Sequence, residues 1–500
     1  MFGEHKARTR FAIVIGVSIL LLLPCFWQSR IQAGDLSSHI YNAWLVELIQ
    51  QGRVQGLTTV PLFTNVLFDL VLSAVLRVAG SGAAQRVAVS LSVLVFVWGA
   101  FAFAAAVSRR RPWHVLPFAA MLAYGWVFHM GFFNFHLSLG LCLWALAALW
   151  RPSLRRILAG GAILVVAVTA HALPVAWTLG LVTYTLVARR VPARYRPLLT
   201  GGCVVLLAAV NRFVAATYFS SWTPQQIAIA TGADQVWVFG EKYGLVMIGL
   251  VAGWCWFLAR LWKRRGKLRI ALGLPFQLCV LSAAVVVAIP NTVMLPMYRH
   301  GLAYIPERMS LATAVCVCAL LAAVPARLSE QAAMWAVASV FFLFVYADER
   351  ALNRFEDRID EAVAGLPHFQ RVFTTFIDQD SRIDGVYHML DRACIGRCFS
   401  YANYEPASWA FRVRAIAANP YVVARPGVSS EIQNGRYTWQ EGDLPAYRVD
   451  VAPSTGSLFV IPAKAGSQCG NTSLQILPRW TWENTGGRYT AGSMPSPGRG

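Results

Sequence analysis

The most constraining feature of this sequence is a series of apolar runs, each about 20 residues long, separated by short basic clusters. Hydrophobic residues make up 57% of the 500 residues and charged residues only 14%, with a formal net charge of +20. Runs of this length suit helices that cross a bilayer, and basic clusters gather in cytoplasmic loops. The pattern predicts a polytopic α-helical membrane protein. No nucleic-acid partner is expected, because the basic residues form short loop clusters and no patch on a soluble face.

The first two apolar runs decide the predicted topology. The run from Phe11 to Trp27 follows a basic N-terminus and is typical of an uncleaved signal anchor, with its N-terminus in the cytoplasm. The run Pro61–Ala79 contains Asp69. If it is a second surface helix, the basic cluster 109–111 stays cytoplasmic, as the positive-inside rule prefers. Residues 30–85 then form one external loop with two surface helices.

The remaining runs predict spans in register with the basic clusters. They lie near Val87–Val107, Val115–Phe128, Phe135–Trp150, a pair meeting at Ala170–Pro174, Leu198–Tyr218, Gly244–Trp262, Ile270–Ile289 and a last pair flanking Pro325–Arg327. The total is about eleven spans, with nearly every dense basic cluster on the cytoplasmic side. A twelve-span alternative, in which Pro61–Ala79 also crosses, loses this agreement.

The composition changes sharply at Asp348, where a small external domain is predicted to begin. The expected organisation is a transmembrane domain (1–347), an external mixed α/β domain (348–485) and a disordered, Gly/Ser/Pro-rich tail (486–500). Strands are expected at Gly385–Leu390 and Ser457–Ile461. If this domain faces an oxidising compartment, Cys394 and Cys398 can form a disulfide.

The stretch Gly34–Ile49, directly after the first span, is the leading functional candidate. Its apolar residues recur at helical spacing, which predicts an amphipathic helix lying on the membrane surface. Asp35 and His39 stand four residues apart at its start and face the same way. Two interpretations of Asp35 stay open: a functional carboxylate, or an N-cap of this helix.

Histidines and an asparagine gather in turns on the predicted external side. His129 and His136 bracket a helix-to-helix turn that contains Asn134, and His171 lies in a very short turn between two spans. Ionisable groups near membrane depth are costly and tend to mark functional sites. For the two histidines of the longer turn, packing inside the protein is the alternative to substrate binding.

Two charged loop segments are further candidates for substrate binding. Glu241-Lys242 either contacts substrate or forms a solvated ion-paired turn. Arg299 and His300 lie in one external loop, which Glu307 and Arg308 close. A guanidinium matches the geometry of a phosphate, so the two arginines either bind a lipid phosphate or snorkel at helix ends.

This organisation resembles the GT-C class of membrane glycosyltransferases, which includes protein O-mannosyltransferases, aminoarabinose transferases and oligosaccharyltransferases. The likeness covers the long first external loop with an acidic residue and surface helices, the many spans and the C-terminal external domain. Asp35 occupies the place of the acidic residue in the first loop. Members of the class often have paired acids there, whereas Leu36 follows Asp35 here.

The resemblance implies sugar transfer from a polyprenyl-phosphate donor in the membrane lipid to an acceptor on the external face, in a bacterial inner membrane. Asp35 would act as general base or help bind a divalent metal. Arg299 and Arg308 would neutralise the departing lipid phosphate. Tyr41, on the same helix as His39, and the other external candidates would line the substrate site.

Two other functions stay open. A transporter or lipid flippase would carry ionisable residues near the bilayer midplane, where Arg212 is the clearest candidate. A non-catalytic envelope assembly protein would use its tail to bind partners and would not need Asp35.

Overall fold

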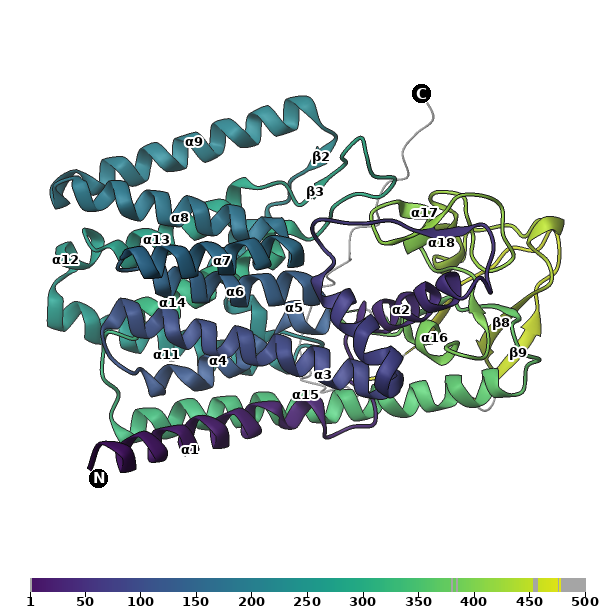
Figure 1. Ribbon diagram of the computed structural model, residues 1–500, viewed down its shortest axis with the longest axis horizontal. Coiled ribbons are helices and arrows are strands. Elements are labelled where there is room, and N and C mark those ends of the chain that lie inside the picture. Colours follow the sequence, from purple (N-terminus) through teal and green to yellow (C-terminus); the bar gives the residue numbers. More distant parts are fainter. Residues whose placement is uncertain (1, 379–380, 384, 453–456, 475, 478–500) are drawn as a thin grey trace, which may run out of the picture.

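The computed structural model describes the chain except residues 1, 379–380, 384, 453–456, 475 and 478–500. The predicted disordered tail, 486–500, lies outside the described residues. A bundle of helices forms one half of the molecule, and a smaller domain of short helices and strands forms the other (Figure 1). The long helix α15 (Leu328–Ala364) runs from the bundle into the smaller domain.

A helix occupies every position at which a span was predicted. Besides α15, the helices of the bundle are α1 (Phe2–Leu22), α3 (Leu67–Ser108), α4 (Leu116–Ala123), α5 (Trp126–His129), α6 (Phe133–Leu149), α7 (Leu154–Ala170), α8 (Ala172–Arg190), α9 (Arg196–Thr217), α11 (Tyr243–Arg265), α13 (Leu274–Ala288) and α14 (Ile305–Leu321). Among the described residues, five helices are long and apolar enough to cross a membrane: α3, α8, α9 with the turn before it, α11 and α15.

Helix α9 shows why the bundle suits a membrane. It lies at the outer edge of the bundle (Figure 1), and Thr200 is the one buried residue of this fully described helix. Leu198, Val205 and Phe213 are exposed. Such an apolar helix is unfavourable in water but favourable against lipid chains.

Small residues let the central helices of the bundle approach closely. A Cβ on Gly99 of α3 would lie 2.5 Å from the carbonyl oxygen of Gly140 in α6. A Cβ on Gly140 would lie 2.8 Å from the backbone of Phe96. Small residues at helix crossings are typical of membrane bundles, where van der Waals packing holds helices together.

The predicted second surface helix, Pro61–Ala79, is the first part of α3. Helix begins at Leu67 and continues to Ser108, with non-helical backbone at Gly80 (φ 79°, ψ 174°). The sequence-based boundary at residue 85 therefore falls inside α3, and a kink replaces the expected loop. Glycine adopts this conformation without the steric cost that a side chain would bring.

The first predicted surface helix exists as α2 (Leu36–Gln50), but its expected half-exposed position is wrong. The face that carries Ser38 and Asn42 is buried as well as the apolar face. Ser38 Oγ donates to Glu405 Oε1 at 3.0 Å, and Asn403 Nδ2 donates to Asn42 Oδ1 at 2.9 Å. The C-terminal domain therefore covers the polar face of α2.

The C-terminal domain is a small α/β unit, as predicted. Its main sheet has the strand order β6-β4-β8-β9 and mixed direction, with β4 parallel to β6 and β8, and β9 antiparallel to β8. Its elements are β4 (Arg371–Phe373), β5 (Phe376–Asp378), α16 (Met389–Ala393), β6 (Phe399–Ser400), α17 (Glu405–Ser408), β7 (Val413–Ala415), α18 (Val428–Gln433), β8 (Ala446–Val451), β9 (Leu458–Pro462) and β10 (Thr472–Leu474).

Local predictions in this domain had mixed outcomes. The strand at Ser457–Ile461 is confirmed as β9, and the disulfide between Cys394 and Cys398 is confirmed. The strand at Gly385–Leu390 is wrong, since the chain there forms turns that lead into α16. The run is too short for its apolar residues to distinguish a strand from a helical turn.

Shorter elements complete the structure. They are β1 (Leu57–Thr59), β2 (Ser220–Ser221), β3 (Thr292–Val293), α10 (Gln225–Ala228), α12 (Lys267–Ala271) and the 3-10 turns Leu23–Cys25, Trp113–Val115, Ala193–Tyr195, Ala233–Val236 and Glu441–Asp443. Strand β1, in the first loop, pairs antiparallel with β7 of the C-terminal domain. The first loop and the C-terminal domain are thus one packed unit, although about 350 residues separate them in sequence.

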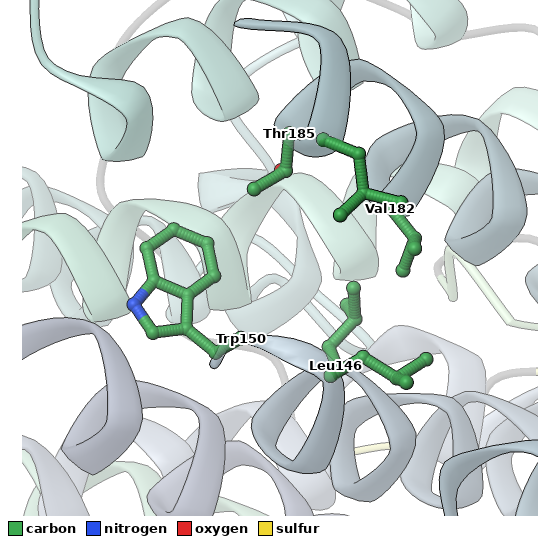
Figure 2. Close-up of a pocket in the computed structure, with 6 residues that line it drawn as sticks. Leu146, Trp150, Val182 and Thr185 are labelled. Atoms are coloured by element: carbon green, nitrogen blue, oxygen red, sulfur yellow. The ribbon is translucent and has the colours of Figure 1, made fainter. Parts of the chain in front are cut away.

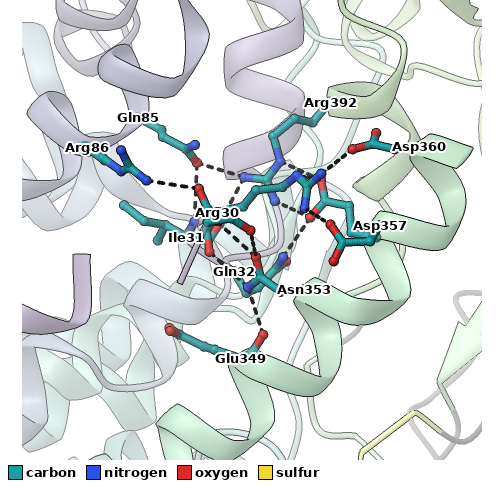
Figure 3. Close-up of polar contacts among 12 residues, drawn as sticks. Arg30, Ile31, Gln32, Gln85, Arg86, Glu349, Asn353, Asp357, Asp360 and Arg392 are labelled. Carbon is teal, nitrogen blue, oxygen red and sulfur yellow. Dashed lines mark hydrogen bonds and ion pairs between the residues drawn. The ribbon is translucent and has the colours of Figure 1, made fainter. Parts of the chain in front are cut away.

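An ion-pair network fixes this unit to α15 (Figure 3). Glu356 of α15 is fully buried and binds Arg392 through both carboxylate oxygens, at 2.7 and 2.6 Å. Gln32 donates to the same carboxylate at 2.7 Å, and Arg30 pairs with Asp357 at 2.6 Å. The predicted boundary at residue 347 therefore falls within a continuous helix that carries part of this junction.

Candidate functional site

Asp35 is fixed against the turn that joins α5 to α6. Its backbone N–H donates to the carbonyl of Met130 at 3.0 Å, and the N–H of Gly34 donates to the carbonyl of His129 at 2.7 Å. Gly131 has φ +86°, and a Cβ there would lie 2.4 Å from the backbone nitrogen of Asp35. The close approach requires glycine at position 131.

The Asp35 carboxylate points toward the C-terminal domain. It makes no capping hydrogen bond to α2, all of which the structure describes, and its side chain is 26% exposed. Nε2 of His388 lies 3.6 Å from Asp35 Oδ1. Asp35 is therefore the N-cap residue of α2 by position, but its side chain makes no capping hydrogen bond, and the carboxylate remains available for another partner.

Asp391 holds the imidazole of His388 on the side that faces away from Asp35. Nδ1 of His388 lies 2.8 Å from Oδ2 of Asp391, whose Oδ1 accepts a hydrogen bond from Ser400 Oγ at 2.5 Å. His388 and Asp391 are both buried. Burial alone lowers the pKa of His388, but the hydrogen bond and charge of Asp391 and the charge of Asp35 reverse this, so the pKa is raised.

Tyr404 and His300 form the other side of the site around Asp35. The ring centroid of Tyr404 lies 5.6 Å from that of His388 and 5.3 Å from that of His300. Burial and the carboxylates of Asp35 and Glu405 hold the pKa of Tyr404 well above its ordinary value. Burial also lowers the pKa of His300, and the charge of Asp35 opposes that change.

The two predicted phosphate-binding arginines lie beside this site without acidic partners. The guanidinium of Arg299 stacks 3.7 Å from the ring centroid of Trp409, and that of Arg308 lies 3.8 Å from the ring centroid of Phe132. Within the described part of the chain, neither forms an ion pair, and Arg308 Nε has no hydrogen-bond partner. Each keeps donors available, although a common phosphate contact stays a prediction.

His39 pairs with Asp69 of α3. Its Nδ1 lies 2.7 Å from Oδ1 of Asp69, and Asn134 Nδ2 donates to the other oxygen of Asp69 at 2.8 Å. Burial disfavours a charged His39, but the Asp69 carboxylate outweighs it and raises the pKa to about 9. Burial raises the pKa of Glu405 to about 7, against the opposing charge of His39.

A small cleft lies beside this pair, between α2 and the C-terminal domain. Its empty volume, including space open to solvent, is about 290 Å³. The polar residues that line it are His39, Asn42, Asn65, Asp69, Glu405 and Arg412. Asp35 and the cleft thus both lie where the first loop meets the C-terminal domain.

No family model, curated protein or solved structure matches this chain.

Other predicted residues have structural roles away from Asp35. His136 is buried, with Nδ1 2.8 Å from Ser92 Oγ, so the packing alternative holds for it. His171 Nδ1 accepts the N–H of Leu173 at 3.2 Å and caps α8. Tyr41 Oη accepts the backbone N–H of Ser400 at 3.0 Å. These three side chains therefore stabilise the fold through hydrogen bonds within the protein.

Among the remaining predicted residues, His129 and Lys242 pair with carboxylates of α15. Buried His129 Nε2 lies 3.4 Å from Glu349 Oε1. Lys242 is buried and pairs with Asp348, while Glu241 is exposed, so the solvated ion-paired turn is wrong. Glu307 is half-buried at the start of α14, and its carbonyl accepts from Gln235 and Ser310, as far as the described residues show.

A divalent-metal role for Asp35 finds no ligand set here. Among the described residues, no group of three or more His, Cys, Asp or Glu side chains is placed to hold a metal ion. Instead, Nδ1 of His39 hydrogen-bonds with Asp69, and Nδ1 of His388 hydrogen-bonds with Asp391.

A second small cavity, drawn in Figure 2, lies at the C-terminal end of α6, whereas Asp35 lies against the turn before α6. It is lined by Leu146, Leu149, Trp150, Val182, Thr185 and Leu186. These residues offer no titratable or nucleophilic group except the hydroxyl of Thr185. The cavity therefore carries no chemistry comparable to that around Asp35.

Sequence reasoning missed the residues that the C-terminal domain contributes: His388, Asp391, Tyr404 and Glu405. The spacing of His388 and Asp391 on one helical turn was the available signal, since residues three apart share a face. Asp69 was noted as an interruption of an apolar run, and that rarity was a signal for a functional or paired carboxylate.

Proposed function

We propose that this chain is an integral membrane glycosyltransferase of the GT-C class. It transfers a sugar from a polyprenyl-phosphate donor in the membrane to an acceptor on the external face, with Asp35 as general base. The observation that carries the proposal is the placement of Asp35. Its partly exposed carboxylate makes no capping bond to α2, and it stands where the helical bundle meets the C-terminal domain.

The proposed reaction is a displacement at the anomeric carbon of the donor sugar. The acceptor hydroxyl oxygen forms the new bond to that carbon while its proton passes to Asp35. The bond from the anomeric carbon to the phosphate oxygen breaks, and the electron pair leaves with the phosphate. Arg308 and Arg299, which have no ion-pair partner among the described residues, neutralise the departing charge.

The proposed topology places this site on the external side of a bacterial inner membrane. About eleven spans, with the N-terminus in the cytoplasm and the C-terminal domain outside, put the dense basic clusters in the cytoplasm. The disulfide between Cys394 and Cys398 supports an oxidising compartment for the C-terminal domain. Arg212, the residue on which a transporter function would depend, is exposed on the outer helix α9.

The test is Asp35→Asn, which keeps the size of the side chain and removes its charge. The full-length protein in lipid nanodiscs is given polyprenyl-phosphate glucose, mannose or galactose together with a cell-envelope extract as acceptor. Release of polyprenyl phosphate is followed by mass spectrometry. We expect release by the wild type and a loss of about a hundredfold or more in the variant. Yield and thermal stability should stay near wild type.

Glu47→Gln is the matched control, because Glu47 lies on the same helix and is partly exposed near its other end. It should release polyprenyl phosphate at the wild-type rate. Equal rates for Asp35→Asn and the wild type would show that Asp35 is not the base.

A further inference from the structure

We propose that His388 is the positioning residue of this site, and that the C-terminal domain supplies it so that Asp391, His388 and Asp35 form one carboxylate–imidazole–carboxylate chain. The charged imidazole of His388 stabilises the ionised form of Asp35, the proposed base. His388 itself does not contact the sugar. The inference rests on the proposed function and identifies a further residue on which that function depends.

The geometry of His388 orients its ring toward Asp35. Nδ1 lies 2.8 Å from Oδ2 of Asp391, and a carboxylate only accepts hydrogen bonds, so Nδ1 carries the proton and donates. Nε2 then faces Asp35 Oδ1 at 3.6 Å, which is the distance of an ion pair rather than of a hydrogen bond. Ser400 Oγ holds Asp391 in turn.

The surroundings favour a charged imidazole at this position. His388 is 3% exposed and Asp391 is 2% exposed, so solvent screens their interaction little. Charged or titratable groups face the pair from every element packed around it. Asp391, Asp35 and Glu405 act on His388, while His39, His300, Arg308, Tyr404 and Glu405 interact with Asp35.

A charged His388 has a consequence for the pH dependence of transfer. An opposite charge within about 4–6 Å favours the ionised form of a carboxyl group, with effects of about 1–3 pH units. Removing the imidazolium therefore moves the acidic limb of the rate profile to higher pH. The donor KM should change little, because His388 acts through Asp35.

The experiment measures kcat and donor KM from pH 4 to pH 9 for the full-length protein in nanodiscs, with whichever polyprenyl-phosphate hexose the wild type uses. His388→Gln should move the acidic limb of the rate profile to higher pH by about one pH unit or more. Asp391→Asn should shift the acidic limb in the same direction but by less. It removes the carboxylate that raises the pKa of His388, so the imidazole is protonated less readily. His368→Gln, an exposed histidine of the same domain, should leave the profile unchanged.

The outcomes separate this inference from the proposed function. A wild-type acidic limb in both His388→Gln and Asp391→Asn, while Asp35→Asn is inactive, would overturn the role of His388 and leave Asp35 as the base. A lower yield of His388→Gln with an unchanged profile in the folded fraction would likewise overturn it. If His388→Gln does not fold, Asp391→Asn decides, because it keeps the imidazole in place.

Discussion

At the scale of single residues, the molecule depends on how closely the first loop approaches the α5–α6 turn. Asp35 is positioned by two backbone hydrogen bonds to that turn and by the absence of a side chain at Gly131. These backbone contacts fix the position of the Asp35 backbone, from which the carboxylate projects. The local rigidity of the site is therefore a property of the turn as much as of Asp35.

Gly131→Ala should disrupt the site far more than a glycine substitution normally does. A left-handed backbone costs a residue with a side chain about 1–2 kcal/mol, and the new Cβ would lie 2.4 Å from the nitrogen of Asp35, so the loop must also move. Gly52→Ala is the control, because Gly52 has φ +68° and no atom within 4 Å of the new Cβ. Gly131→Ala should lower both the thermal stability and the transfer rate. Gly52→Ala should lower the thermal stability by less and leave the transfer rate unchanged. Equal losses in the two variants would contradict the close approach.

At the scale of elements, the helices were predictable and their surroundings were not. Apolar runs and basic clusters are local patterns, so a helix is found wherever a span was predicted. The burial of α2 depends on Asn403 and Glu405, more than 350 residues away, and no local pattern reveals them. The pairing of His39 with Asp69 was hidden for the same reason.

The contribution of α15 is to join the bundle to the C-terminal domain through Glu356. Glu356→Gln leaves the buried guanidinium of Arg392 without its carboxylate, and removing one partner of a buried pair typically costs about 3–5 kcal/mol. Asp357→Asn is the control, since the Asp357 side chain is 56% exposed and surface pairs contribute about 0–1 kcal/mol. Unfolding midpoints of the purified proteins should fall clearly for the first variant and little for the second. Similar shifts would show that the buried network is not what holds the two parts together.

At the scale of the whole molecule, the candidate site lies at one end of the helical bundle. The first loop, the C-terminal end of α15 and the C-terminal domain all gather at the same end of the bundle (Figure 1). Asp35 belongs to the first of these segments, His388 to the last, and Arg308 to the start of α14. The proposed lipid-linked donor, whose phosphate lies at the membrane surface, would meet residues from the first loop, the C-terminal domain and α14. The site is therefore built from the C-terminal domain and the bundle together.

The proposed topology fixes which end of the bundle is external, and accessible cysteines test it. Gly82→Cys, at the kink of α3, and Asn434→Cys, on the C-terminal domain, lie at exposed positions, as do Arg110→Cys and Lys267→Cys in basic clusters. Cys255, the exposed free cysteine among the described residues, is first replaced with Ser. A membrane-impermeant maleimide on right-side-out vesicles should label positions 82 and 434 directly, and positions 110 and 267 only after permeabilisation, because basic clusters stay cytoplasmic. Protection of position 82 with labelling of position 434 would mean that the first part of α3 crosses the membrane, and the count of about eleven spans would then be wrong.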